Sequence, residues 1–163
     1  MMPADPCSPC SLSPQRLASH IMASSSAPLT EEQRTSLRAA ALAAAEHSYS
    51  PYSRFRVGAA LLLTNGDVVT GANVENASYR LTVCAEQAAI AAAVALHGHS
   101  IRIRAVVIAN LNKAPSQPCG ACRQTIHEFS TPSTEIFFPT ADGALTRSTI
   151  TGLLPSAFLL NNR

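Results

Sequence analysis

The segment CAEQAAIAAAVALHG, residues 84–98, carries a clear structural signal. Alanine favours helix more than any other residue, and neither proline nor glycine interrupts the segment before Gly98. Glycine commonly follows the last residue of a helix, so Cys84 to His97 is predicted to form a buried helix that ends at Gly98. The apolar residues 105–109, AVVIA, predict a strand after it.

Another helix and a hairpin are predicted on the N-terminal side. Residues 30–33, TEEQ, are typical of an N-cap followed by acids in the first helical turn, and this helix should end before residue 50. Residues 56–64 and 68–74 are apolar or β-branched. Asn65-Gly66 between them is a strong hairpin signal, so two antiparallel strands are expected.

The C-terminal side adds a helix, two strands and a short final helix. Pro118 precedes a helical stretch at residues 120–129, strands are predicted at 134–139 and 144–148, and a helix at 150–154. Strands that alternate with helices favour a mixed sheet covered on its faces. The predicted fold class is α/β, a three-layer α/β/α sandwich with a mixed five-stranded sheet.

A chain of 163 residues is long enough for one domain, which we place at residues 29–163. Residues 1–28 are rich in serine and proline and contain one acid, Asp5, so a disordered N-terminal extension is predicted. A transit peptide shares this bias but is usually rich in arginine, and Arg16 is the only one there. Met22 is an alternative start.

Composition excludes several classes of protein. A charged fraction of 13% and a net charge of +2 argue against binding to a polynucleotide, and no stretch has the roughly 18 apolar residues that a membrane span needs. Four of the five cysteines form two Cys-x-x-Cys pairs. This spacing suits metal ligation in a reducing compartment, so an intracellular, cytoplasmic protein is expected.

Three cysteines form a candidate zinc site. Cys84 opens one predicted helix, and Cys119 and Cys122 open the next, where the helix N-terminus favours the thiolate that binds zinc. Three protein ligands leave the fourth tetrahedral position for water, as in catalytic zinc sites. Glu86 follows Cys84 by two residues and is placed to carry protons to and from that water.

Simpler interpretations exist for the same residues. Cys119-x-x-Cys122 could form a structural zinc knuckle, for which Cys7 and Cys10 would supply two further ligands. Glu86 could be an acid that only balances the helix dipole. Cys7 and Cys10 are surrounded by serine and proline, with no predicted helix or strand to hold them.

The sequence resembles the cytidine deaminase family in several motifs. Cys84-Ala-Glu86 and PCGACRQ at 118–124, in which Cys119 follows Cys84 by 35 residues, resemble its zinc signature. SPYSRFRVGAAL at 50–61 and GANVENASY at 71–79 are similar to its two nucleoside-recognition stretches, and LLPSAF at 153–158 to its C-terminal element. The resemblance covers residues 29 to 160 in order.

The resemblance implies a cytidine deaminase-like fold and hydrolytic deamination of free cytidine and deoxycytidine in pyrimidine salvage. It implies one Zn²⁺ per chain on Cys84, Cys119 and Cys122, and Glu86 as the catalytic acid and base. The substrate-binding residues that it implies are Phe55 on the base, Asn73 and Glu75 on the ribose 3'-hydroxyl, the Ala85 N–H on the ring carbonyl, and Ala77, Tyr79 and Phe158 at a neighbouring subunit's site. A homotetramer of the small nucleoside type with shared active sites is therefore expected.

One position departs from the family pattern, and three rival functions stand beside the main one. Gln87 replaces the arginine that many all-cysteine members carry there, which leaves Arg123 to disperse the thiolate charge. The rivals are a deaminase of another aminopyrimidine compound, such as blasticidin, a polynucleotide editor, and a non-enzymatic zinc-binding module. Phe55 as plain core, and Asn73 and Glu75 as turn or edge-strand residues, are the corresponding simpler interpretations.

Overall fold

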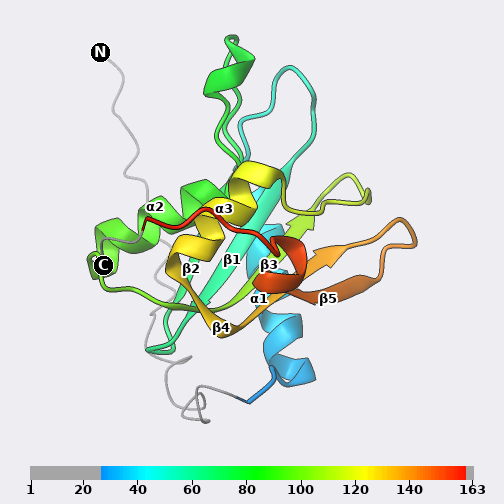
Figure 1. Ribbon diagram of the computed structural model, residues 1–163. Coiled ribbons are helices and arrows are strands. Elements are labelled where there is room, and N and C mark those ends of the chain that lie inside the picture. Colours follow the sequence, from blue (N-terminus) through cyan, green and yellow to red (C-terminus); the bar gives the residue numbers. More distant parts are fainter. Residues whose placement is uncertain (1–26, 161–163) are drawn as a thin grey trace, which may run out of the picture.

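The computed structural model describes residues 27–160, which form one mixed sheet with helices on both faces (Figure 1). The elements in chain order are α1 (Glu31–Ala45), β1 (Val57–Leu63), β2 (Val68–Ala72), the 3₁₀ helix η2 (Tyr79–Leu81), α2 (Ala85–His97), β3 (Ile103–Asn110), α3 (Gly120–Phe129), β4 (Ser130–Pro139), β5 (Leu145–Thr149) and α4 (Ile150–Leu153). Each predicted helix and strand has its counterpart among them.

The five strands lie in the order β2-β1-β3-β4-β5. Strands β1 and β2 pair antiparallel, as do β1 and β3, and β4 and β5, whereas β3 and β4 run parallel. The parallel pair is joined by α3, the crossover helix that parallel strands require. The prediction of a mixed five-stranded sheet is confirmed.

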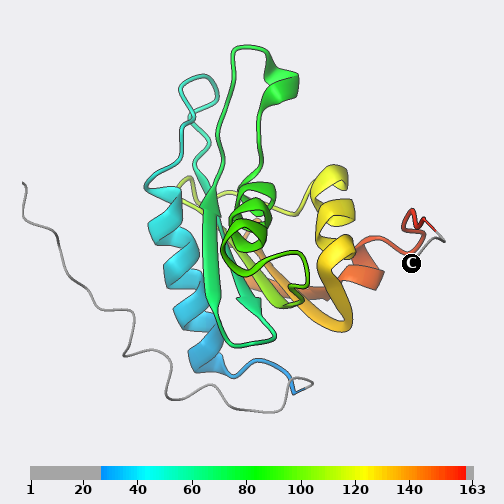
Figure 2. The same ribbon diagram turned by 90° about the vertical axis from the view of Figure 1, so that its left-hand side faces the viewer.

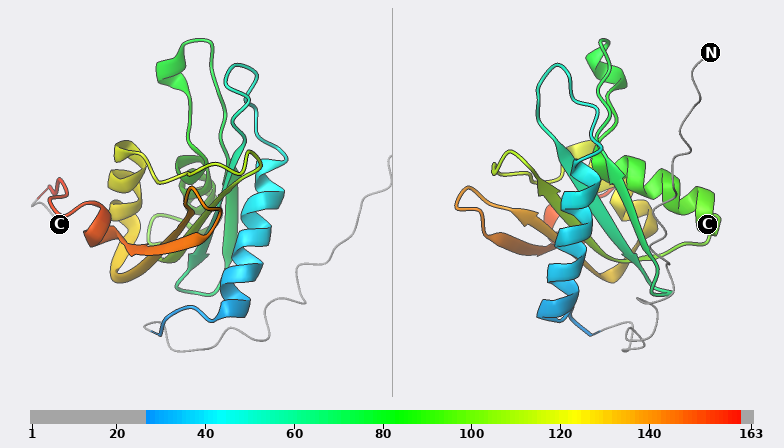
Figure 3. Two further views of the ribbon diagram at one scale, coloured as in Figure 1. Left: turned by 90° about the vertical axis from the view of Figure 1, so that its right-hand side faces the viewer. Right: turned by 180° about the vertical axis from the view of Figure 1, so that it is seen from behind.

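Helices cover the two faces of the sheet unequally. Helix α1 lies alone on one face, and α2 and α3 lie side by side on the other, with α4 next to α3 (Figures 2 and 3). Each face has its own apolar core, one between α1 and the sheet and one between the sheet and α2, α3 and α4. The three-layer α/β/α sandwich is therefore confirmed.

Local sequence signals explain where several elements begin and end. The Thr30 side chain accepts a hydrogen bond from the Gln33 N–H, and the Gln33 side chain accepts one from the Thr30 N–H, which makes a capping box at the start of α1. Gly66 in the β1–β2 turn has φ of 94°, and Gly98 after α2 has φ of 83°. Both backbone conformations are easy for glycine and strained for other residues.

Strand β2 is shorter than the predicted 68–74, whereas helix α1 ends at Ala45, before residue 50 as predicted. After α1 the chain turns to pair with the segment after β2. The Tyr49 N–H donates to the Asn73 carbonyl at 3.1 Å, and the Tyr49 carbonyl accepts from the Glu75 N–H at 2.7 Å. Strand β2 accordingly ends at Ala72, where Asn73 leaves the regular ladder. These are long-range pairings, which local propensity does not report.

Residues 73–84 form an arm that projects beyond the end of the sheet, with η2 at its tip (Figures 1 and 2). A bridge between Val74 and Val83 closes the base of the arm. Tyr79 and Leu81 in η2 are largely exposed. The 3₁₀ turn was not predicted from the sequence, but it lies inside the motif at residues 71–79.

Two glycines allow the helices to approach the sheet closely. A Cβ atom on Gly58 would lie 1.9 Å from the Ala41 carbonyl oxygen of α1, and one on Gly71 would lie 2.3 Å from the Ala89 nitrogen and 2.8 Å from the Ala85 carbonyl oxygen of α2. Such distances are far inside van der Waals contact, so any larger residue must push the helix away. Gly71 therefore sets the distance between β2 and the first turns of α2.

The residues just before α1 are anchored by two hydrogen bonds near the N-terminal end of that helix. The Arg104 guanidinium donates to the Ala27 carbonyl at 3.1 Å, and the buried Glu135 carboxylate accepts from the Leu29 N–H at 2.8 Å. Most of the predicted N-terminal extension, including Cys7, Cys10 and Met22, lies outside the described residues. Within residues 27–160, no helix is long and apolar enough to span a membrane.

We expect Gly71→Ala to destabilise the fold by roughly 1–3 kcal/mol, as overpacking of a tight contact does. The added methyl group would meet backbone atoms of α2, which cannot move aside as a flexible side chain can. Urea unfolding followed by circular dichroism measures the effect. Thr70→Ala on the exposed face of β2 is the matched control and should shift stability by only about 0.5 kcal/mol. Equal unfolding midpoints for the two variants would contradict the role of Gly71.

Candidate metal centre and active site

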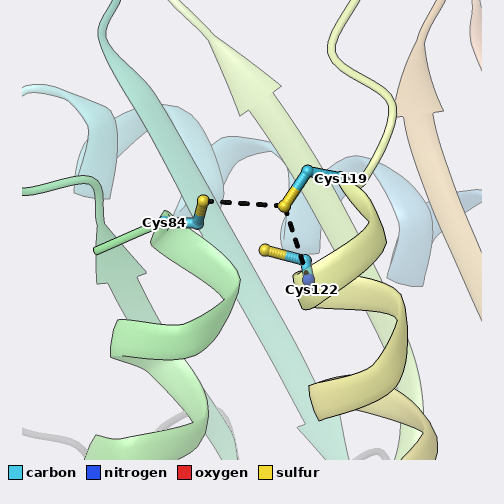
Figure 4. Close-up of side chains that lie close together, drawn as sticks. All are labelled: Cys84, Cys119 and Cys122. Carbon is cyan, nitrogen blue, oxygen red and sulfur yellow. Dashed lines mark hydrogen bonds between the residues drawn. The ribbon is translucent and has the colours of Figure 1, made fainter. Parts of the chain in front are cut away.

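Three cysteine sulfurs converge where α2 and α3 begin. Cys84 is the N-cap of α2, Cys119 is the N-cap of α3, and Cys122 lies in the first turn of α3. Their Sγ atoms all lie within 4.8 Å of one another, and the three side chains point towards a common centre (Figure 4). The structure thus brings together the three cysteines that the sequence singled out.

The spacing of these sulfurs suits a bound zinc ion. Zinc–sulfur bonds of about 2.3 Å in tetrahedral geometry place two sulfur ligands about 3.8 Å apart. The Cys84 and Cys119 sulfurs are 3.9 Å apart, much farther than the roughly 2.05 Å of a disulfide. The Cys119 sulfur also accepts a hydrogen bond from the Cys122 N–H at 3.4 Å. That bond orients the sulfur and stabilises negative charge on it.

The thiols influence each other's protonation. The hydrogen bond from the Cys122 thiol lowers the pKa of Cys84 to about 7. The same contact, together with burial, raises the pKa of Cys122 above its ordinary value. A thiolate at Cys84 therefore disfavours a second one at Cys122, and a cation at the centre would offset that repulsion.

Glu86 lies in the first turn of α2 and is buried beside the three thiols. Burial raises the pKa of its carboxyl group above the ordinary value, and a hydrogen bond with Cys122 opposes part of this effect. A buried carboxyl group is costly unless it has a partner or a function. Its place beside the candidate zinc ligands is the one expected of a group that exchanges protons with a bound water.

Arg123 has a different contact set from the one expected. Its guanidinium donates to the Pro118 carbonyl at 2.9 Å and to the Leu153 carbonyl at 3.1 Å, and within residues 27–160 it makes no hydrogen bond to a thiol. Arg123 therefore fastens the turn before Cys119 to helix α4. Any effect on the thiolate charge acts through space.

A cavity of about 430 Å³ opens onto the candidate metal centre. Cys84, Ala85, Glu86 and Cys119 form one end of it. The rest of the lining comes from residues 53–57, from the arm at residues 73–84, from strand β3 and from the loop after it: Ser53, Phe55, Val57, Asn73, Glu75, Tyr79, Thr82, Ile108, Pro115, Ser116 and Gln117. An apolar wall with a few polar groups is typical of a small-molecule site.

Asn73 is held by protein groups on three sides. Its Oδ1 atom accepts from the Val57 N–H at 2.8 Å and from the Ser48 hydroxyl at 2.6 Å, and its Nδ2 atom donates to the Phe55 carbonyl at 2.8 Å. The family resemblance implies that this side chain binds the ribose, and an asparagine buried here needs polar partners in any case. The structure shows that the loop before β1 already supplies such partners, and that Asn73 in turn fixes this loop.

Glu75 is also bound to the loop before β1. One carboxylate oxygen accepts from the Tyr52 N–H at 2.9 Å and the Ser53 N–H at 3.2 Å, and the other accepts from the Ser53 hydroxyl. The Ser53 hydroxyl, with these two N–H groups, holds the pKa of the Glu75 carboxyl below its ordinary value. Glu75 is therefore an acceptor in the cavity wall, with a fixed orientation.

Two expected site residues lie away from this cavity. Ala77 is exposed in the projecting arm. Phe158 is 67% exposed, and its backbone N–H and carbonyl are bound by the side chain of Gln124 on the outer side of α3. Neither residue contributes to the pocket of its own chain, whereas Tyr79 lines that pocket and is also 68% exposed.

Sequence reasoning missed several residues of the cavity. Ser53 and Thr82 line it, and Ser116 and Gln117 belong to the loop that leads to Cys119. Ser53 lies inside the motif at residues 50–61, so its position carried a signal that was not used. The loop residues have no comparable signal, because they reach the cavity only through the turn that follows β3.

The chain matches known proteins over most of its length. A family model described as the cytidine and deoxycytidylate deaminase zinc-binding region matches residues 31–138. Cytidine deaminase from Halalkalibacterium halodurans is 45% identical over 118 residues, which cover 72% of this chain and 88% of that protein.

Solved structures agree with the sequence match. The crystal structure of cytidine deaminase from Mycobacterium tuberculosis has a TM-score of 0.68 and 41% identity, covering 77% of this chain and 97% of that one. The structure from Burkholderia pseudomallei has a TM-score of 0.69 and 41% identity, covering 80% and 100%. With the three thiols and the buried Glu86 at the helix ends, these matches show that the chain belongs to the zinc-dependent cytidine and deoxycytidylate deaminase family.

Proposed function

We propose that this protein hydrolyses the exocyclic amine of cytidine and deoxycytidine, which yields uridine or deoxyuridine and ammonia. The observation that carries the proposal is the buried Glu86 beside three convergent thiols, at the end of a cavity that has the size of a small-molecule site. The relatives that bear the name cytidine deaminase support the same substrate class.

The residues at the metal centre fit zinc. Cys84, Cys119 and Cys122 would hold the ion, which would act there as a Lewis acid and lower the pKa of a bound water. The Glu86 carboxylate takes a proton from the attacking water and delivers it to the ring nitrogen N3. As the C4–O bond forms and the C4–N bond breaks, the same carboxyl group transfers the second proton to the departing amine, so the reaction balances as water in and ammonia out.

The remaining cavity residues suit the nucleoside. Phe55 offers an aromatic face for the pyrimidine, and the Ala85 N–H belongs to the first turn of α2, whose N–H groups have no carbonyl partner within the helix and would bind the ring carbonyl. Asn73 uses one N–H of its amide on Phe55 and makes no other donor bond within residues 27–160, and Glu75 offers a fixed acceptor. Asn73 and Glu75 are therefore placed to bind the ribose 3'-hydroxyl group.

A homotetramer with shared active sites is part of the proposal. Phe158, Leu159 and Leu160 form an exposed apolar tail, and Tyr79 exposes its ring at the arm. Exposed apolar groups of this size commonly mark an interface. Ala77, Tyr79 and Phe158 would then complete the pocket of a neighbouring subunit. A role in pyrimidine salvage in the cytoplasm is consistent with three unpaired cysteines, which persist in a reducing compartment.

We expect one zinc per chain, because three thiolates with one open position bind this ion tightly. Replacing Cys84, Cys119 or Cys122 by alanine should lower the zinc content well below one per chain in elemental analysis. Replacing both Cys7 and Cys10 by serine is the control and should leave zinc content and activity unchanged. Loss of zinc from the control variant would show that the N-terminal cysteines are ligands.

Glu86→Gln should keep the zinc and the fold but lower kcat by roughly 10²- to 10⁴-fold, since the amide cannot accept or donate the transferred protons. The loss of absorbance when cytidine becomes uridine measures the rate, and deoxycytidine, blasticidin and the nucleotides are compared in the same assay. A near-normal rate would exclude Glu86 as the proton carrier. Zinc-loaded wild-type protein that turns over none of these compounds would favour the non-enzymatic alternative.

Phe158→Ala should raise KM for cytidine and weaken assembly together, because one side chain is proposed to serve both. Light scattering reports the assembly, and steady-state kinetics at several enzyme concentrations report the shared site. Val68→Ala, which trims a partly exposed valine at the start of β2, is the control and should change neither property. A fully active wild-type monomer would overturn the assembly and the shared site.

A further inference from the structure

We propose that Asn112, in the loop after β3, is a positioning residue that holds Phe55 against the substrate base. The proposal rests on the proposed function, in which Phe55 packs on the pyrimidine. The four backbone groups nearest the Phe55 side chain are all bound by side chains, and Asn112 supplies two of these bonds.

The Asn112 amide binds both neighbours of Phe55. Its Nδ2 atom donates to the Arg54 carbonyl at 3.0 Å, and its Oδ1 atom accepts from the Arg56 N–H at 2.9 Å. One amide group thus binds the peptide groups on either side of Phe55: its N–H faces a carbonyl, and its oxygen faces an N–H.

The backbone of Phe55 itself is bound by two other side chains. The Phe55 N–H donates to the Ser53 hydroxyl at 2.9 Å, and the Phe55 carbonyl accepts from Asn73 Nδ2 at 2.8 Å. Ser53 and Asn73 both line the cavity, and Asn73 is also proposed to contact the sugar. Asn112 does not line the cavity, so its contribution to Phe55 is indirect.

Residue 54 explains why this segment needs such support. Arg54 has φ of 59°, in the left-handed region that residues other than glycine rarely adopt. Its N–H is bound to the Ser50 carbonyl at 3.0 Å, which closes the turn before it. A strained turn persists only where surrounding contacts hold it, and the bond from Asn112 to the Arg54 carbonyl is one of these contacts.

Asn112 acts as a continuation of the sheet. The β1–β3 ladder ends at the pair Val57 and Asn110, and the Leu111 N–H then donates to the Arg56 carbonyl at 3.1 Å. Asn112 takes the next position along the chain and pairs through its side chain, where a strand would pair through its backbone. The loop before β1 is thereby tied to the sheet beyond the last regular pair.

Asn112 is itself held by Asn110, which is buried at the end of β3. Asn110 Oδ1 accepts from the N–H groups of Asn112 and Ala114, at 3.0 and 3.1 Å, and Asn110 Nδ2 donates to the Ser116 hydroxyl at 2.6 Å. The same loop continues to Cys119. The candidate zinc ligand Cys119 and the ring of Phe55 are therefore connected through one short loop, whose hydrogen bonds centre on Asn110.

The first test is the kinetics of Asn112→Ala with cytidine. Losing one or two hydrogen bonds to an exposed loop should raise KM about threefold to tenfold and leave kcat within about twofold, because the proton-transfer groups are untouched. Asn65→Ala is the matched control: Asn65 is an exposed loop asparagine that also uses a donor and an acceptor, on Asp67, at the opposite end of β1. Its KM should equal that of the wild type.

A double-mutant cycle separates positioning from a general structural effect. In the Phe55→Ala background, Asn112→Ala should add less than about twofold to KM, since no ring remains to be placed. An undiminished KM effect in that background, or an unchanged KM in the single variant, would overturn the proposal.

Amide hydrogen exchange in the zinc-loaded protein tests the same inference without turnover. Asn112→Ala should accelerate exchange at Arg56 by about tenfold or more, whereas Val57, whose N–H is held by Asn73, serves as the internal reference. Unchanged exchange at Arg56 would overturn the proposal. If the wild-type protein fails to deaminate cytidine while Asn112→Ala still accelerates exchange at Arg56, the proposed substrate is refuted and the positioning of residue 55 remains supported.

Discussion

The close contact between α2 and β2 at Gly71 is the constraint on which the site depends. Because Gly71 carries no side chain, the backbone at Ala85 and Ala89 lies directly against the strand. Cys84 and Glu86 flank that contact on the helix, and Asn73 and Glu75 follow it by two and four residues along the chain. The distance between β2 and α2 at Gly71 thus fixes the separation between the metal-binding end of the cavity and the proposed sugar-binding side.

A network of polar side chains holds the loop between α1 and β1, which forms another part of the cavity wall. The segment between α1 and β1 has few regular backbone partners, and Ser53, Asn73, Glu75 and Asn112 bind its N–H and carbonyl groups instead. Such groups would be costly if left unpaired in a cavity wall, so the network defines the conformation of the loop as well as satisfying it. Residues proposed to contact the nucleoside are therefore also the residues that shape its pocket, and catalytic and structural roles overlap.

The metal centre follows from the ends of two helices that lie side by side. Both α2 and α3 direct their N-termini, where the backbone dipole favours anions, to the same point. This arrangement offsets part of the cost of gathering three thiolates beside the buried Glu86. The crossover from β3 to β4 brings α3 to that position, and Arg123 ties its first turn to α4 near the C-terminal tail. The C-terminal residues 158–160, which are proposed to reach a neighbouring subunit, are thus linked through Arg123 to the turn that carries Cys119 in their own chain.

The sequence by itself determined the helices, the hairpin at Asn65-Gly66, the α/β layering and the three cysteines with Glu86, because caps, turns and ligand spacing are local signals. Only the tertiary structure decided that Asn73 and Glu75 are satisfied by the loop before β1, that Arg123 binds carbonyls, and that Gln124 holds the backbone of Phe158. Asn112 had no signal in the sequence at all. Its importance arises from a contact between residues 56 positions apart, and such contacts exist only once the sheet has brought two loops together.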